Sequence, residues 1–383
     1  MTRQQKIIVI SAIILLVGIV GLFLLFSKKQ TPTEELPINT VEEDTVTDDF
    51  SQTETLTPQK ITENPVSVFT YRENTLYFID EGGGLFKKQV EEEGASSERI
   101  GTFLVQDPGS LAISKKEDLV LIGEGTPKER RKFTLVNTQT SATTQLPLGV
   151  QAVLFLNDNE LAYYKESLAQ TGVFIYTIKT KKERLVASLI PRDIRLSLFD
   201  ASHLLIVETP TNDVPNFSFL LNLATKKLSP YFTNVLGATI VPIGRERSLA
   251  FLQNPINEDG DKPYNLVLLD KKAHVNTIFS ILTMPEKCVT NSSITYLYCA
   301  VPLEWTKIMP NLDLPDDYYT QRTDFTEKFY RINLITSTAD ELTPNATLED
   351  AIHPVLSADE KTLYFLNRKN GHIYSLVLPT PQQ

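Results

Sequence analysis

The sequence predicts an all-β fold, a seven-bladed β-propeller, and two observations support this prediction. The first is a short apolar strand that follows a polar turn seven times along the chain, as in "NTLYFI", "EDLVLI" and "KTLYFL". The copies recur at steps of 43, 42, 43, 45, 45 and 69 residues, counted between the anchor residues Leu76, Leu119, Leu161, Leu204, Leu249, Ile294 and Leu363. A period of about 40–45 residues with several strands per repeat is typical of propellers, in which each repeat forms one blade.

The second observation is a further strand pair that recurs inside each repeat. After the anchor strand comes a variable link, then an alternating strand, a turn rich in Thr, Lys, Asn and Asp, and a weaker strand, as in "VFIYTIKTKKERLV". Lettered from the axis outward, these are strands c and d of a blade, the anchor strand is b, and the apolar run before it is a. Seven blades then fill residues 65–378. Six or eight blades are the alternatives, because the sixth repeat is irregular.

The seventh blade, which begins near Ala351, ends after its c strand. Only "PTPQQ" follows Leu378. A ring with a missing strand would expose sheet edges, which propellers avoid by closure. The segment near Ile61, just before the first blade, is therefore the predicted donor of the missing strand.

The last blade, "LSADEKTLYFLNRKNGHIYSLVL", carries a recognisable pattern. It reads S-x-D-x-x-L-x-F…G-x-I-Y and resembles the repeats of TolB-like, WD-type (WD40-like) propellers. The other blades share only the hydrophobic skeleton. The resemblance implies a propeller fold and a protein-interaction scaffold, and it carries over no catalytic residue. The matching residues are Ser357, Asp359, Leu363, Phe365, Gly371, Ile373 and Tyr374.

A membrane anchor is predicted near the N-terminus. Residues 7–26 are almost uninterruptedly apolar, and a helix of this length spans roughly 30 Å, the thickness of a bilayer core. The alternative is a cleaved signal peptide, whose apolar run is usually about 7–15 residues and ends in a small-x-small site that is missing here. We therefore expect residues 1–29 to be a cytoplasmic tail and an uncleaved transmembrane signal anchor. The flanking basic residues favour this orientation only slightly.

Residues 30–62 are predicted to be a disordered linker. Residues 31–60 contain eight acids, one base and eight threonines, a composition that cannot support a core. A spacer is the favoured interpretation and a binding tail the alternative. This segment carries a net charge of −7 and residues 1–30 carry +4, so −7 of the total of −10 remains for the domain at 63–383, which is only mildly acidic for its length. It shows no electrostatic footprint for nucleic acid.

Two cysteines, Cys288 and Cys299, occur in the sixth repeat. They fall at the same end of two neighbouring antiparallel strands, so a cross-strand disulfide is geometrically feasible. The alternative is a pair of buried free thiols. A domain outside the membrane lies in an oxidising compartment, which favours the disulfide.

The best candidate for a binding site is the enlarged link of the sixth repeat, residues 302–328. Links this long in compact repeats are usually functional or disordered. Aromatic residues with a few charges are typical of binding hot spots, although these rings could simply pack on the propeller. Links b–c and d–a emerge on one face of a propeller, so this face is the predicted binding face. The candidate residues are Trp305, Asp313, Asp316, Asp317, Tyr318, Tyr319 and Arg322.

No motif in the chain indicates a cofactor or a metal. None of the four histidines stands in a metal-binding spacing. The loop "NPINEDGDKPY" offers oxygen ligands at Asn257, Glu258, Asp259 and Asp261, but it lacks the full spacing of a calcium loop. A solvated turn is the preferred interpretation.

The functional hypothesis is a non-catalytic binding or scaffold module at the cell envelope. Its propeller is expected to be extracytoplasmic and held at the cell membrane by a single-pass helix. An envelope protein or a glycan would be the partner on the b–c face. The alternative is a glycan- or peptide-active hydrolase that uses Asp313, Asp316 or Asp317. Such an enzyme needs paired carboxyl groups about 5–9 Å apart.

Overall fold

The computed structural model describes residues 56–90, 95–125, 131–253, 264–303, 312–320, 323–344, 346 and 348–379. They belong to one compact unit, Glu54–Gln383. The predicted anchor at 7–26 and most of the predicted linker lie outside the described residues. In the described ranges, no helix is both long and apolar enough to cross a membrane.

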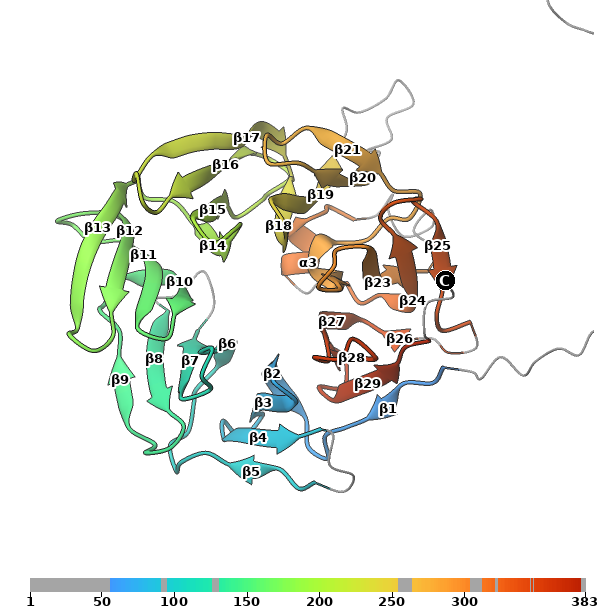
Figure 1. The fold of residues 1–383 in the computed structure, drawn as a ribbon, viewed down its shortest axis with the longest axis horizontal. Coiled ribbons are helices and arrows are strands. Elements are labelled where there is room, and N and C mark those ends of the chain that lie inside the picture. Colours follow the sequence, from blue (N-terminus) through green and yellow to red (C-terminus); the bar gives the residue numbers. More distant parts are fainter. Residues whose placement is uncertain are drawn as a thin grey trace, which may run out of the picture. The chain divides into compact units, whose positions relative to one another are not determined.

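The unit is a ring of seven antiparallel sheets around a central axis (Figure 1), which confirms the predicted seven-bladed propeller. Blade one consists of β2 (Val66–Arg72), β3 (Thr75–Asp80), β4 (Leu85–Gln89) and β5 (Glu98–Arg99). Blade two consists of β6 (Pro108–Ile113), β7 (Leu119–Glu124), β8 (Lys132–Asn137) and β9 (Thr143–Gln145). Blade three consists of β10 (Val150–Asn157), β11 (Glu160–Lys165), β12 (Gly172–Thr177) and β13 (Lys182–Ser188).

The second half of the ring repeats the same order from the axis outward. Blade four consists of β14 (Ile194–Leu198), β15 (His203–Glu208), β16 (Pro215–Asn222) and β17 (Leu228–Leu236). Blade five consists of β18 (Thr239–Gly244), β19 (Arg247–Gln253), β20 (Tyr264–Leu269) and β21 (Val275–Ile278). Blade six consists of β22 (Cys288–Thr290), β23 (Tyr296–Pro302), β24 (Thr326–Asn333) and β25 (Ala339–Glu341), with β26 (Leu348–Glu349) also paired to β24.

Blade seven is built from both ends of the domain. It consists of β27 (Ala351–Leu356), β28 (Thr362–Asn367), β29 (Ile373–Val377) and, as its outer strand, β1 (Gln59–Lys60). Gln59 pairs with Ser375, and the Ile61 N–H donates to the carbonyl of Ile373 at 2.8 Å. The predicted strand donor near Ile61 is thus present. Since β1 falls within residues 30–62, the ring includes the end of the segment expected to be linker.

The anchor residues form the buried b strands because each falls where a pleated strand enters the interior. Leu76, Leu161, Leu204, Leu249 and Leu363 are fully buried. The sixth anchor differs from the prediction. Ile294 lies in the turn before β23 with φ of +54°, and Leu297, fully buried in β23, takes the equivalent place. The polar run "TNSS" before Ile294 forms a longer turn than the repeat period implies.

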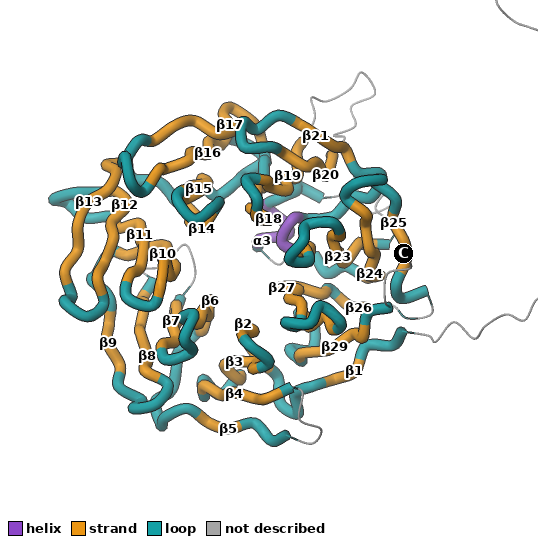
Figure 2. Tube along the Cα trace, in the orientation of Figure 1, coloured by secondary structure: helices purple, strands orange, loops and turns teal. Residues whose placement is uncertain are grey.

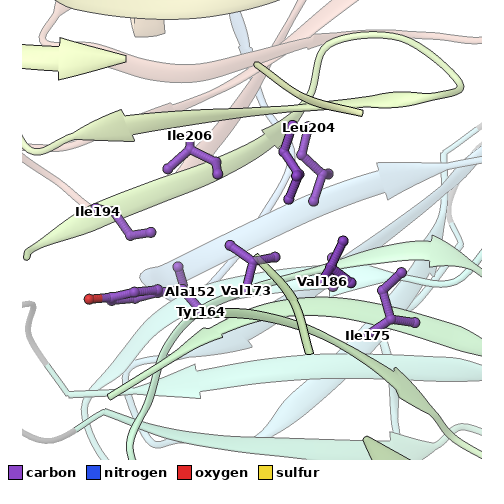
Figure 3. Packing of buried hydrophobic residues seen from close by; sticks show 10 residues of the cluster. Ala152, Tyr164, Val173, Ile175, Val186, Ile194, Leu204 and Ile206 are labelled. Atoms are coloured by element: carbon purple, nitrogen blue, oxygen red, sulfur yellow. The ribbon is translucent and has the colours of Figure 1, made fainter. Parts of the chain in front are cut away.

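The hydrophobic core consists of layers between neighbouring blades. In the layer between blades three and four, Ile194, Leu204 and Ile206 of blade four face Ala152 and Val173 of blade three (Figure 3). Alternating side chains of each strand reach the two faces of its sheet, so every blade contributes to two layers. A lone blade would leave both faces exposed, and only the ring buries them.

Cys288 and Cys299 lie directly opposite each other on β22 and β23, with 4.2 Å between their Cα atoms. The structure joins them by a disulfide. The bridge fixes the inner strand of blade six to its neighbour.

The links between strands divide between two faces of the ring. Links b–c and d–a emerge on one face, here called the upper face, and the a–b and c–d turns emerge on the lower face. The helical segments in the described ranges are the 3-10 helix η1 (Pro285–Lys287) and the α-helix α3 (Asp316–Tyr319). Both belong to upper-face links, and α3 lies near the axis beside β18 and β23 (Figure 2).

Candidate functional site at the mouth of the axial channel

A cavity of about 360 Å³ lies where the upper-face links converge on the axis. Its walls come from blades two, four, six and seven, which are distributed around the ring (Figure 1), so the cavity lies at the axis, here called the mouth of the axial channel. The side chains that carry its chemistry are Arg131, Asp193, Arg195, Glu286, Tyr319 and His353.

One wall of the cavity is a compact cluster of Arg195, Glu286 and Tyr319. Nη1 of Arg195 lies 3.0 Å from Oε1 of Glu286, and the Tyr319 hydroxyl donates to the same oxygen. The guanidinium also lies over the Tyr319 ring, 4.1 Å from its centroid. Oε2 of Glu286 is buried without a hydrogen-bond partner in the part of the chain described. Glu286 is therefore already engaged, whereas Arg195 retains further N–H donors.

A second wall carries Arg131 and Asp193. Nη1 of Arg131 donates to the backbone carbonyl of Gln151 at 3.1 Å. In the described ranges, no carboxylate forms an ion pair with this guanidinium. Burial lowers the pKa of Arg131, the charge of Asp193 raises it, and the like charge of Arg195 lowers it further. The guanidinium groups of Arg131 and Arg195 therefore repel each other at this mouth. Asp193 is exposed to solvent.

His353 stands on the inner strand of blade seven in an uncommon conformation. Its φ is +52°, in the left-handed region, where the β27–β28 register shifts between Ile352 and Val355. Such a conformation for a non-glycine residue is uncommon and concentrates at functional positions. The imidazole is surrounded by protein on the channel wall yet open to solvent within the cavity. Desolvation, with the charges of Lys287 and Arg368, lowers the pKa of His353.

Beneath the cavity, between blades six and seven, lies a network of buried charges. Lys287, Glu327 and Asp350 are fully inaccessible to solvent. Nζ of Lys287 lies 2.6 Å from Asp350 Oδ1 and 2.8 Å from Glu327 Oε1, the latter as an ion contact without hydrogen-bond geometry. Arg368 Nε donates to Asp350 Oδ2 at 2.7 Å. Two cations and two carboxylates therefore neutralise one another at the joint.

The carboxylates of α3 were predicted to be candidates for binding or catalysis. Asp316 Oδ2 accepts the backbone N–H of Asn212 at 2.8 Å, which ties α3 to blade four. Asp317 Oδ2 accepts the N–H of Asp313 at 2.8 Å, and Asp313 itself is exposed. The half-buried carboxylates of Asp316 and Asp317 thus fix the link that contains α3, the first to blade four and the second within the link itself.

The tyrosines of α3 take different positions. Tyr318 is buried and packs on Phe325, with Lys287 and Arg368 near the face of its ring. Tyr319 offers its hydroxyl to Glu286 and its ring face to Arg195, and both tyrosines line the cavity. Trp305 and Arg322 lie outside the described residues, as do Asn257, Glu258, Asp259 and Asp261. Elsewhere in the described ranges, no group of three His, Cys, Asp or Glu residues is arranged to hold a metal.

A set of exposed apolar side chains, here called the apolar arc, stands on the same upper face as the cavity. All five stand in b–c or d–a links of blades one to four. Single exposed apolar residues are ordinary, but a group on one face of successive blades is typical of an interaction surface. The arc comprises Leu104, Leu148, Leu168, Ile190 and Val214.

An apolar pocket of about 220 Å³ opens between blades three and four at the same face. Its lining includes Leu189, Ile190, Ile206 and Phe217. Ile194 lines both this pocket and the axial cavity, so the two hollows are neighbours. Arg192, which is paired with Glu208 at 2.9 Å, stands at the rim.

Sequence reasoning missed Arg131, Arg195 and His353. A signal was present, because the first residues of each inner strand stand at the mouth of the channel. Aligning the seven inner strands would have placed Arg195 and His353 there. Arg131 ends the long b–c link "EGTPKERRK" of blade two, in a region already predicted to belong to the binding face.

No protein-family model and no curated protein matches the chain. Solved structures resemble it at the level of fold. A prolyl endopeptidase matches at 11% identity with a TM-score of 0.53, over 83% of this chain and 50% of its own. This chain thus spans about half the length of that protein.

Two further solved structures match over almost their whole length. An oligogalacturonate lyase in complex with manganese has 10% identity and a TM-score of 0.54, over 85% of this chain and 97% of its own. The β-propeller domain of Myceliophteria thermophila Cps50 (Swd1) has 11% identity and a TM-score of 0.51, over 84% and 100%. Because these neighbours include both enzymes and a propeller domain, the likeness shows the fold alone.

Proposed function

We propose that this protein is a binding or scaffold module that receives a protein partner on the upper face of its propeller. The single observation that carries the proposal is the apolar arc of Leu104, Leu148, Leu168, Ile190 and Val214 on the same face as the axial cavity. Apolar side chains around polar anchor groups are the composition of protein-binding surfaces. The proposal retains the predicted face and changes the residues expected to make contact.

We infer that the repeats are of the TolB-like, WD-type class. The support is a turn that recurs before strand b. In blade seven, Ser357 Oγ donates to Asp359 and accepts the N–H of Thr362 at 2.9 Å. In blade two, Ser114 Oγ donates to Asp118 and accepts the N–H of Leu119 at 3.0 Å.

The proposed location is the outer side of a membrane, with the chain anchored through residues 7–26. The apolar run supports the anchor, and the Cys288–Cys299 disulfide supports an oxidising compartment. Digestion of intact cells with a protease tests this placement. Loss of the propeller with retention of a short N-terminal fragment is the expected result, and full protection would contradict it.

A hydrolase that uses Asp313, Asp316 or Asp317 receives less support. Asp316 and Asp317 accept backbone N–H groups of nearby loops, which is a structural role. We therefore prefer binding to catalysis for this face.

Site-directed photo-crosslinking of the full chain in its native membrane tests the binding face. A crosslinker at Leu148 or Leu168 should capture one defined neighbour, and one at Ile335, exposed in a lower-face turn, should not. The double variant Leu148→Glu, Leu168→Glu should weaken capture about tenfold or more from a third upper-face site, whereas Ile335→Glu should leave it unchanged. Equal capture from both faces would overturn the proposal.

A further inference from the structure

The axial cavity holds two cationic side chains with spare hydrogen-bond donors. The Arg368 guanidinium donates hydrogen bonds to Asp350 and to the carbonyls of Thr323 and Tyr318. In contrast, Arg195 shares one carboxylate with Tyr319, and Arg131 donates to one carbonyl. Each guanidinium has five N–H donors in a planar fork, so both retain donors.

Arg131 and Arg195 share the cavity with two carboxylates, Asp193 and Glu286. Glu286 pairs with Arg195 and accepts the Tyr319 hydroxyl, so part of the charge of Arg195 is already compensated. Asp193 is exposed, and its charge raises the pKa of Arg131, whereas the like charge of Arg195 lowers it. A carboxylate between the two guanidinium groups would relieve their repulsion and accept charge-assisted hydrogen bonds from both.

The neighbouring apolar pocket adds a second requirement on the ligand. Ile194 lines both hollows, so the two hollows adjoin at this residue. In an extended peptide, side chains at i and i+2 project to the same side, about 7 Å apart. A peptide with an acidic residue followed two positions later by a large aliphatic residue could use both hollows at once.

The geometry points to an acidic-aliphatic peptide segment of a protein partner, of the form Glu-x-Leu, as the ligand of the upper face. Its carboxylate binds Arg131 and Arg195 in the axial cavity, and its aliphatic side chain fills the pocket beside Ile194. This inference rests on the proposed function, since it names the chemistry that the binding face recognises.

Fluorescence polarisation of labelled peptides on the full chain in nanodiscs tests the inference. The probes are a Gly/Ser-flanked Glu-Gly-Leu peptide and its Gln-Gly-Leu, Glu-Gly-Ser and Lys-Gly-Leu analogues. The Glu-Gly-Leu peptide should bind about tenfold or more tightly than the Gln and Ser analogues, because each change removes one of the two contacts.

Two arginine variants separate specific recognition from general charge. Arg131→Gln should abolish the preference for Glu over Gln in the peptide. Arg247→Gln, which removes an exposed arginine on the lower face, should preserve it. Equal binding of the Glu and Gln peptides, or no binding of the Glu peptide up to about 1 mM, would overturn the inference.

Other outcomes separate this inference from the proposed function. Tighter binding of the Lys peptide would reverse the sign of the charge that the cavity takes and would also overturn the inference. If photo-crosslinking from Leu148 captures a neighbour equally in wild type and Arg131→Gln, the binding face stands and the carboxylate inference falls. If no neighbour is captured from the upper face, the proposed function itself falls.

Discussion

The two sides of the channel mouth are both built from upper-face links, but their charged side chains differ in how they are paired. The side at blades six and seven is here called the closed side, and the side at blades two to four the open side. At the joint of blades six and seven, buried charges pair with one another, and Tyr318 packs over them. Towards blades two to four, Arg131 lines the axial cavity, and the apolar arc stands on the same face as this cavity and the apolar pocket. The charged groups of the closed side pair with one another, whereas Arg131 on the open side has no carboxylate ion-pair partner in the described ranges. A ligand therefore gains most on the open side, and mutations should cost most stability on the closed side.

The largest expected effect is the loss of Lys287. Lys287→Met would leave Glu327 and Asp350 buried with only Arg368 to neutralise them. We expect the free energy of unfolding to fall by about 3–5 kcal/mol, because an unpaired buried charge is strongly destabilising. Urea unfolding with the disulfide intact measures it. The control Lys271→Met removes an exposed partner of Glu246 and should change stability by less than about 1 kcal/mol. A similar small loss for Lys287→Met would contradict the closed-side account.

The second prediction concerns pH. Burial raises the pKa of Glu327 to about 7, against the partly compensating charge of Lys287. The unfolded chain releases this proton near pH 4.5, so the folded state holds an extra proton between these values. The contribution of Glu327 should therefore fall as pH rises from about 4.5 to about 7, by on the order of 3 kcal/mol, and then level off.

Glu327→Gln isolates this effect. The amide oxygen can still accept the N–H of Ala351, but the group no longer ionises. Unfolding titrations at several pH values should show a flatter pH dependence than in the wild type. Glu98→Gln, which alters an exposed carboxylate paired with Lys87, should keep the wild-type dependence. An unchanged slope in Glu327→Gln would show that another group controls it.

The third prediction concerns the disulfide of blade six. Replacing both Cys288 and Cys299 with Ser should lower the free energy of unfolding by about 2–3 kcal/mol, since the bridge closes a short loop across two strands. Thermal unfolding with and without a reducing agent measures the effect. The reduced wild type should approach the double variant, whose Tm should not respond to reductant. A wild-type Tm insensitive to reductant would contradict the prediction.

The smallest effect should come from the open side. Arg131→Gln removes one hydrogen bond to a carbonyl and a partly buried cation, so stability should change by about 0.5 kcal/mol or less. Urea unfolding of Arg131→Gln and Lys287→Met under the same conditions compares their free energies of unfolding directly. A loss of about 2 kcal/mol or more would show that Arg131 is a structural residue and would weaken the distinction between the two sides.

The fold could be predicted from the chain because its signal is local and repeated. Most b strands begin with a fully buried leucine after a polar turn, and the pattern places Leu76, Leu161 and Leu363 without knowledge of neighbours. The prediction was less accurate at Leu119, which is only partly buried, and at Ile294, where a longer turn moved the buried position to Leu297. The strand near Ile61 could be predicted because the last blade had one strand too few.

The site was harder to predict because it depends on contacts between distant residues. Lys287, Glu327 and Asp350 come from separate links, and nothing in their local sequence shows that they share one buried space. Tyr318 and Asp317 have the composition of a binding site, yet one packs inward and the other holds its own turn. Sequence composition identified the correct face, but only the ring determines which side chains point inward and which remain open.

The pairing of β1 with β29, here called the seam, closes the ring through the two strands that are farthest apart in the sequence. Gln59 and Ser375 meet only after every intervening blade has been synthesised, so closure is a late step with a long loop to form. Until then the outer edge of β29 is an unpaired strand, which invites pairing with another chain. A pull on the residues that precede β1 would act directly on this short pairing. The seam is therefore where mechanical load would first open the circle.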